Sequence, residues 1–176
     1  MSATEWLVRT ARSSDQKLLA AFSCAASGVR WETEVETFIR GTILRWAHDP
    51  NAKAQDPRLL LLFQRRPREF VGLAAHERTK LLANNADIFD ATKLEVVAIA
   101  RDWQGRRFRG GARASDVLMS AVMTDISARV PPRDARVFAV VHEKNVRSIE
   151  LCRRHGLVEE LSRPAPDYRR LITGRK

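Results

Sequence analysis

The chain lacks several features that mark membrane, secreted and metal-binding proteins. Its 176 residues contain no long apolar run, and no apolar signal follows the N-terminal Met1. The two cysteines, Cys24 and Cys152, show no metal or redox spacing, and the four histidines are not arranged as ligands. We therefore expect a cytoplasmic protein with reduced thiols, no metal site and no membrane partner.

The overall composition is that of an ordinary globular protein with an excess of positive charge. The 44% hydrophobic and 30% charged residues of this 20.0 kDa chain predict one domain over residues 1–176. The net charge of +10 would suit a polyanionic partner such as RNA, because clustered Lys and Arg release counterions from phosphate. The basic residues are spread along the chain, however, which favours scattered solvated charge.

Hydrophobic periodicity predicts an alternation of strands and helices along the chain. Short apolar runs indicate strands at 5–9, 59–63, 70–75, 93–100, 136–141, 157–161 and 168–172. Helical spacing indicates helices at 14–22, 32–46 and 115–129 and another from Asn145, and the polar stretch 77–92 is expected to be a loop. The expected fold is α/β of the α+β type, with a mixed, largely antiparallel, twisted sheet of six to seven strands and helices on both faces.

A loop rich in glycine and arginine joins the strand at 93–100 to the helix at 115–129. A strand, such a loop and a helix together point backbone N–H groups and a helix dipole at a phosphate, and Arg adds bidentate contacts. The sequence therefore predicts a pyrophosphate site. Its candidate contacts are Gln104, Gly105, Arg107, Arg109, Gly110, Gly111 and Ala112.

A second segment of interest begins at Asn145, just after the apolar run 137–141. The Asn145 side chain can cap a helix that turns Ile149 and Leu151 inward, and Gly156 can end that helix in the left-handed conformation. Capped amphipathic helices occur in many α/β proteins, so this segment by itself indicates only a helix.

In this order and spacing, the two segments resemble motifs of the GNAT acyltransferase superfamily over residues 93–157. The first family motif, Gln/Arg-x-x-Gly-x-Gly/Ala, is matched by residues 107–112. The second begins with Asn and carries Leu-Tyr-x-x-x-Gly-Phe. Its positions are occupied here by Asn145, Ser148, Leu151, Gly156 and Leu157. The resemblance implies a GNAT-like fold for the whole chain.

The glycine pattern of the first motif departs from the family. If residues 104–105 began a tighter loop, Arg107 and Arg109 would stand where glycines are needed for close backbone approach. We therefore favour a longer loop whose glycines are Gly110 and Gly111.

The resemblance implies an N-acetyltransferase that moves acetyl from acetyl-CoA to a primary amine by direct attack in a ternary complex. Backbone groups at Val97 and Ile99 would receive the pantetheine arm of CoA like an added strand. Asn145 and Ser148 would contact CoA from their helix, and the early helices would form one wall of the acceptor site.

Two side chains are candidates for proton transfer in such a reaction. Glu95 would share a face of its strand with Ile99, and it is expected either to take the amine proton or to form a structural ion pair with an Arg. Cys152 stands where many family members have the tyrosine that protonates the departing CoA thiolate. Its thiol is expected either to take over that role or to pack as a small hydrophobe.

Two further functions fit the same residues. A toxin-like relative would acetylate the amine of an aminoacyl-tRNA, a reading favoured by the segments 22–24 and 35–39 and by the positive charge. A degenerate member would bind CoA or nucleic acid without turnover, because Arg stands in glycine positions and Cys152 replaces the tyrosine. The sequence does not tell a small-molecule amine from a peptide amine as acceptor, and homodimers are common in the family.

Overall fold

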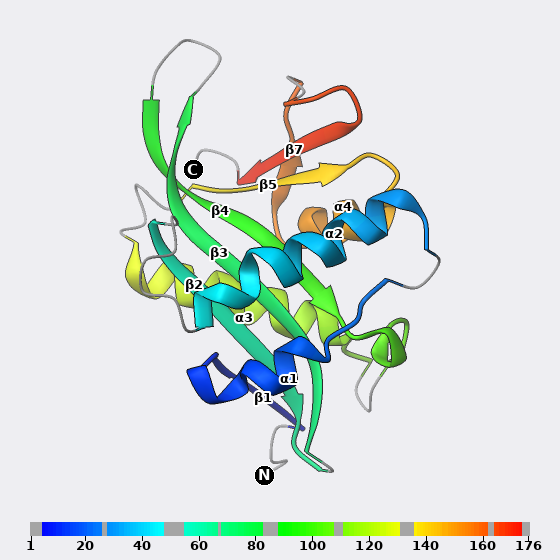
Figure 1. Ribbon diagram of the computed structural model, residues 1–176. Coiled ribbons are helices and arrows are strands. Elements are labelled where there is room, and N and C mark those ends of the chain that lie inside the picture. The colour runs from blue at the N-terminus through cyan, green and yellow to red at the C-terminus, as the bar shows by residue number, and fades with distance from the viewer. Residues whose placement is uncertain are drawn as a thin grey trace.

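The computed structural model describes residues 5–25, 28–47, 55–66, 68–82, 88–107, 111–130, 136–161 and 164–173. Within these ranges seven strands form one open sheet in the order β1-β2-β3-β4-β5-β7-β6 (Figure 1). The strands are β1 (Trp6–Thr10), β2 (Gln55–Gln64), β3 (Glu69–Leu82), β4 (Ile88–Ile99), β5 (Val137–His142), β6 (Leu157–Glu159) and β7 (Tyr168–Thr173). All neighbouring pairs are antiparallel except β4 and β5, which run parallel. The predicted mixed, largely antiparallel sheet is therefore confirmed.

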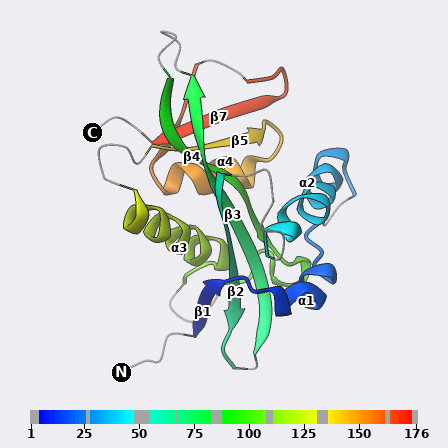
Figure 2. The ribbon, with the colours of Figure 1, turned by 60° about the vertical axis from the view of Figure 1, so that its left-hand side comes forward.

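Helices cover both faces of this sheet, as predicted (Figure 2). On one face lie α1 (Gln16–Ala20) and α2 (Arg30–Gly41), and on the other lie α3 (Ala114–Arg129) and α4 (Val146–Arg154). The helix expected at 32–46 is divided, because α2 ends at Gly41 and a 3-10 helix, η2 (Ile43–Ala47), follows. Two more 3-10 helices are η1 (Ser13–Asp15) and η3 (Arg101–Trp103).

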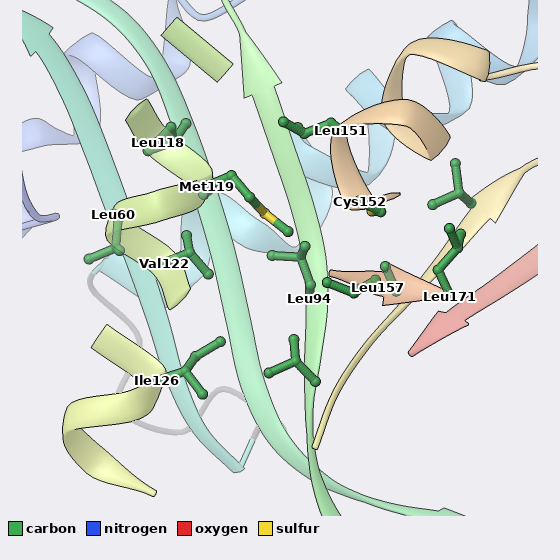
Figure 3. Close-up of a cluster of buried hydrophobic side chains, with 14 of the residues drawn as sticks. Leu60, Leu94, Leu118, Met119, Val122, Ile126, Leu151, Cys152, Leu157 and Leu171 are labelled. Atoms are coloured by element: carbon green, nitrogen blue, oxygen red, sulfur yellow. The ribbon is translucent and has the colours of Figure 1, made fainter. Parts of the chain in front are cut away.

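Each face of the sheet carries its own hydrophobic core. On the α3 face, Leu118, Val122 and Ile126 recur every four residues and therefore point toward Leu60 of β2 and Leu94 of β4 (Figure 3). Burying each of these side chains contributes about 1.5–3 kcal/mol. On the other face, α1, α2 and η2 pack against β2, β3 and β4. The two cores fix which residues of the central strands face which side.

The hairpin of β3 and β4 differs most from the sequence-based expectation. The prediction of a loop at 77–92 is wrong, because β3 continues to Leu82 and β4 begins at Ile88, and the two strands pair over this length. Arg78 and Lys80 alternate with less exposed residues, so one side of the strand meets solvent. This end of the hairpin therefore lacks the continuous apolar run on which the strand predictions rested.

Candidate active site

The strand β4 carries a β-bulge at the centre of the sheet. Two successive residues of β3, Ala75 and His76, pair with residues of β4 that are two positions apart, which leaves Glu95 as the extra residue. On its other side β4 pairs with β5 only over Thr92–Leu94. A bulge bends its strand and increases the local twist. Beyond it β4 and β5 separate (Figure 1), and in the described part of the chain no strand pairs with that edge of β4.

A cavity of about 410 Å³ fills the space between the separating strands. Residues 93–97 of β4 and 139–142 of β5 form its sides, Trp31 of α2 lies at one end, and Asn145 and Cys152 of α4 line the other. Because α2 and α4 belong to opposite faces of the sheet, the cavity passes through the sheet plane. It can therefore receive one reactant from each face, and its size is that of a small-molecule site.

Glu95 lies on the α2 face, among charged groups. Its side chain is only 7% exposed, and its Oε1 lies 2.6 Å from Nζ of Lys93. The expectation that Glu95 shares a face with Ile99 is wrong: Ile99 packs against the α3 core, because the bulge shifts the alternation of side chains by one residue. An ion pair was one of the two expected roles, and its partner is a Lys rather than an Arg.

A second carboxyl group adjoins Glu95. Burial, a hydrogen bond with Glu95 and the charge of Glu95 together raise the pKa of Glu77 to about 6, although the charge of Lys93 acts to lower it. The cavity is thus bordered by a carboxylate that already interacts with an ammonium group and with another carboxyl group.

The helix α4 starts as the sequence predicts. Asn145 is its N-cap, and the side-chain Oδ1 of Asn145 accepts a hydrogen bond from the backbone N–H of Ser148 at 3.2 Å. Both residues line the cavity, as does Cys152. The Cys152 side chain is nevertheless buried in the α3 core, and this burial raises its pKa to about 11. A thiol in that state is a poor proton donor near neutral pH, which supports packing as its role.

The loop between β4 and α3 contains two left-handed glycines. Gly105 has φ +74° and Gly111 has φ +79°, and α3 begins three residues after Gly111. Gly111 is one of the two glycines of the longer loop expected from the sequence, and the choice between the longer and the tighter loop stays a prediction. Arg107 and Ala112 are exposed in the same loop, near the start of α3. The other two candidates of this loop, Arg109 and Gly110, lie outside the described residues.

Gln104 has a structural role that the sequence did not reveal. Its Nε2 donates hydrogen bonds to the backbone carbonyl of Ile99 at 3.0 Å and to that of Cys24 at 2.7 Å. The backbone N–H of Arg101 also donates to the carbonyl of Ser23. The loop that leaves β4 is therefore tied to the segment between α1 and α2.

Three aromatic rings gather at the α2 end of the cavity. Trp31 stacks on His142, with ring centroids 6.1 Å apart, and His142 meets Tyr168 of β7 edge-on at 5.2 Å. Tyr168 was missed altogether. No local signal marks it, since it reaches the cavity only because β7 pairs with β5 and places it opposite His142.

Two kinds of site find no support in the residues that the structure describes. None of their His, Cys, Asp and Glu side chains form a group of three or more that could hold a metal ion. Nor is any helix among them both long and apolar enough to cross a membrane.

Comparison with known proteins shows a likeness of this fold to that of N-acetyltransferases of known structure. No protein-family model and no curated protein matches the sequence. Solved structures do match over nearly the full length, and the expected GNAT-like fold is confirmed by them.

Three of these structures show the extent of the likeness. The PaiA N-acetyltransferase from Thermoplasma acidophilum, in complex with coenzyme A, is 13% identical with a TM-score of 0.66 over 98% of this chain and 99% of that one. The AtaT toxin, bound to the C-terminus of the antitoxin AtaR, is 15% identical with a TM-score of 0.63 over 96% and 94% of the two chains. A chimera of the spermidine N-acetyltransferase SpeG from Vibrio cholerae is 16% identical with a TM-score of 0.57 over 98% and 96%.

Proposed function

We propose that the protein is an N-acetyltransferase that moves the acetyl group of acetyl-CoA to a primary amine by direct attack in a ternary complex. The observation that carries this proposal is the cavity between β4 and β5, which is bordered by helices of both faces and by the unpaired edge of β4. Two reactants that enter from opposite faces meet there without a covalent enzyme intermediate.

Acetyl-CoA would occupy the α3 and α4 side of the cavity. The pantetheine arm would lie along the edge of β4 from Val97 to Ile99 like an added strand, with a backbone N–H of that edge donating to the thioester oxygen. Asn145 and Ser148 line the same cavity. The pyrophosphate would reach the loop before α3, where the candidate contacts are Gly105, Arg107, Gly111 and Ala112 together with Arg109 and Gly110.

The acceptor amine would enter from the α2 side, where Glu95 can take its proton. An amine attacks a thioester only as the neutral form, so an ammonium substrate must first lose a proton. The CoA thiolate is a tolerable leaving group even when it is not fully protonated. The reaction therefore does not require a proton from Cys152, which fits the burial of that thiol. Peptide and small-molecule amines are both candidate acceptors, and we place the protein in the cytoplasm as a monomer or homodimer.

The first test of this function is calorimetric titration of the protein with acetyl-CoA. Saturable binding is expected in the wild type and in Arg66→Ala, an exposed Arg of the β2–β3 turn. Arg107→Ala should weaken it, because it removes a charged phosphate contact worth about 1.5–3 kcal/mol. A wild type that does not bind acetyl-CoA would refute the proposal.

A second candidate function is acetylation of aminoacyl-tRNA. The likeness to the AtaT toxin and the net charge of +10 favour it. Expression should then arrest growth, and radioactive acetyl from acetyl-CoA should enter aminoacyl-tRNA with a rate that falls steeply with salt. Acetylation of small amines at rates equal to the rate on aminoacyl-tRNA, without any effect of expression on growth, would exclude this second function. Tight acetyl-CoA binding with no turnover on either kind of acceptor would indicate a degenerate binding protein.

A further inference from the structure

A three-residue charged cluster lies on the α2 face of the β3–β4 hairpin. Glu77 of β3 is the direct register partner of Lys93 on β4. The residue before Glu77, His76, points to the α3 face, where its Nε2 lies 3.0 Å from Oδ2 of Asp125. Because successive strand residues face opposite sides, Glu77 points toward the α2 face. The bulge turns Glu95 to that same side, within 2.6 Å of Lys93.

Two residues of the cluster line the cavity and the third lies beyond its lining. Lys93 and Glu95 line the cavity, and the Glu95 side chain is 7% exposed. Glu77 is not among the lining residues, but its carboxyl group hydrogen-bonds that of Glu95 when one of the two is protonated, and it is partly exposed. A proton that reaches Glu95 from the cavity therefore has a neighbouring acceptor, Glu77, which does not line the cavity.

The charges of the cluster leave one carboxylate in excess. Lys93 balances one of the two carboxylates, so Glu77 and Glu95 together can hold one more proton without an uncompensated positive charge. Glu34 of α2 and His142 of β5 line the same cavity as Glu95, and the backbone of Gln55 on β2 hydrogen-bonds Glu77.

We propose that Glu77 is the second carboxylate of a two-residue base, and that it receives from Glu95 the proton which Glu95 takes from the acceptor ammonium. This role rests on the proposed function. The ammonium N–H bond breaks and its proton binds the Glu95 carboxylate, which leaves the neutral amine free to attack. The proton then moves along the hydrogen bond to the Glu77 carboxylate and from there to water, so Glu95 is again ionised. No electrons are exchanged.

The pKa of Glu77 suits this role. Burial and the neighbouring Glu95 raise it to about 6. Glu77 is then mostly ionised near pH 7.5 and can accept a proton, yet it holds that proton more readily than an ordinary Glu.

The test compares Glu77→Gln with Glu69→Gln, an exposed Glu of the same strand. Spermidine and a lysine-containing peptide serve as acceptor probes. In Glu77→Gln we expect kcat/KM to fall about tenfold, less than the ~10²–10⁴-fold expected when the whole base is lost, and the acid limb of the pH profile to move to lower pH. Glu69→Gln should behave like the wild type. An acid limb that Glu77→Gln leaves in place would overturn the proposal, since a merely structural role would change stability and KM only.

A second measurement does not depend on turnover. Carbon-13 NMR of labelled Glu carboxyl groups should show Glu77 titrating near pH 6 in the wild type and at lower pH in Glu95→Gln. Titration of Glu77 in the ordinary Glu range in both proteins would refute the shared proton. A wild type that shows this titration but binds no acetyl-CoA would instead remove the proposed function, and the catalytic role of the pair with it.

Discussion

Burying a carboxylate inside an apolar strand is costly unless the group has a charge partner or a function. Glu95 has a charge partner in Lys93, and its position in the cavity also allows it to act as a base. Lys93 offsets the cost of burying it, while the cavity keeps it within reach of a ligand. The sequence singles out Glu95 because a charged residue interrupts an apolar run. The face to which it points could not be predicted, since the bulge arises from the pairing of β4 with β3.

Replacing Glu95 by Gln tests its role as the base. We expect kcat/KM to fall by about 10²–10⁴-fold, because Gln cannot accept the amine proton, while the Kd of acetyl-CoA stays unchanged. Steady-state kinetics and calorimetry measure the two quantities. Glu150→Gln, at an exposed position of α4, is the matched control. If Glu95→Gln kept full activity, the ion pair with Lys93 would be its whole role.

Replacing Cys152 by Ala separates packing from acid catalysis. The thiol is 4% exposed, and burial raises its pKa to about 11, so its loss should leave kcat within about threefold of the wild type. Urea unfolding should show a loss of ~0.5–1.5 kcal/mol, as for removal of one buried methylene-sized group. A fall in kcat of about 10²-fold or more with unchanged stability would restore the proton-donor role.

At the scale of elements, the β3–β4 hairpin holds the site, and it depends on a close approach at Gly72. A Cβ at this position would lie 2.6 Å from the carbonyl oxygen of Ala98 and 2.9 Å from Cδ1 of Ile99. Those residues belong to the segment of β4 whose opposite edge is proposed to receive pantetheine. Short-range sequence patterns predict such strands and the α4 cap, because both depend on neighbouring residues. They do not predict this contact or Tyr168, which depend on pairing between distant strands.

Gly72→Ala should therefore lower both stability and cofactor affinity. Overpacking of this kind costs ~1–3 kcal/mol, measured as a loss in the free energy of unfolding in urea. Gly41→Ala is the control, since a Cβ on this helical glycine meets nothing within 4 Å and should be neutral or stabilising. Equal stability of the two variants would mean that β3 and β4 can move apart at no cost.

The contact between β3 and α3 should make stability depend on pH. Burial lowers the pKa of His76, although Asp125 acts to raise it. The unfolded chain then binds a proton at higher pH than the folded one, so the stability from His76 is present above pH ~6.5 and is lost as pH falls below it, by at most ~1.4 kcal/mol per pH unit. Glu77 acts oppositely: its raised pKa gives stability that is present below pH ~4.5 and lost as pH rises to about 6. Urea unfolding of the wild type and of His76→Gln at pH 5 to 8 isolates the effect of His76. If the free energy of unfolding changed with pH in the same way in both proteins, this prediction would be contradicted.

On the scale of the whole molecule, two parts of the sheet meet at a narrow junction. The strands β1 to β4 and β5 to β7 are joined by the pairing of Thr92–Leu94 with β5. The alternation of strands and helices along the sequence predicts this class of fold, since each element buries one face. The sequence does not predict the point at which β4 and β5 separate. That point depends on the pairing of only three residues, Thr92–Leu94, with β5 and on the bulge at Glu95.

A ligand in the cavity would contact both sides of this junction, so acetyl-CoA should stabilise the whole protein. Binding only to the folded state at 100 times Kd adds ~2.7 kcal/mol, which corresponds to a rise in Tm of about 5–10 °C for a chain of this size. Thermal scans with and without acetyl-CoA measure it, with Arg66→Ala expected to match the wild type and Arg107→Ala to show a smaller rise. The rise should grow with the logarithm of ligand concentration above Kd, as linkage requires. A Tm that stays constant at millimolar acetyl-CoA would mean that the opening between β4 and β5 does not receive this ligand.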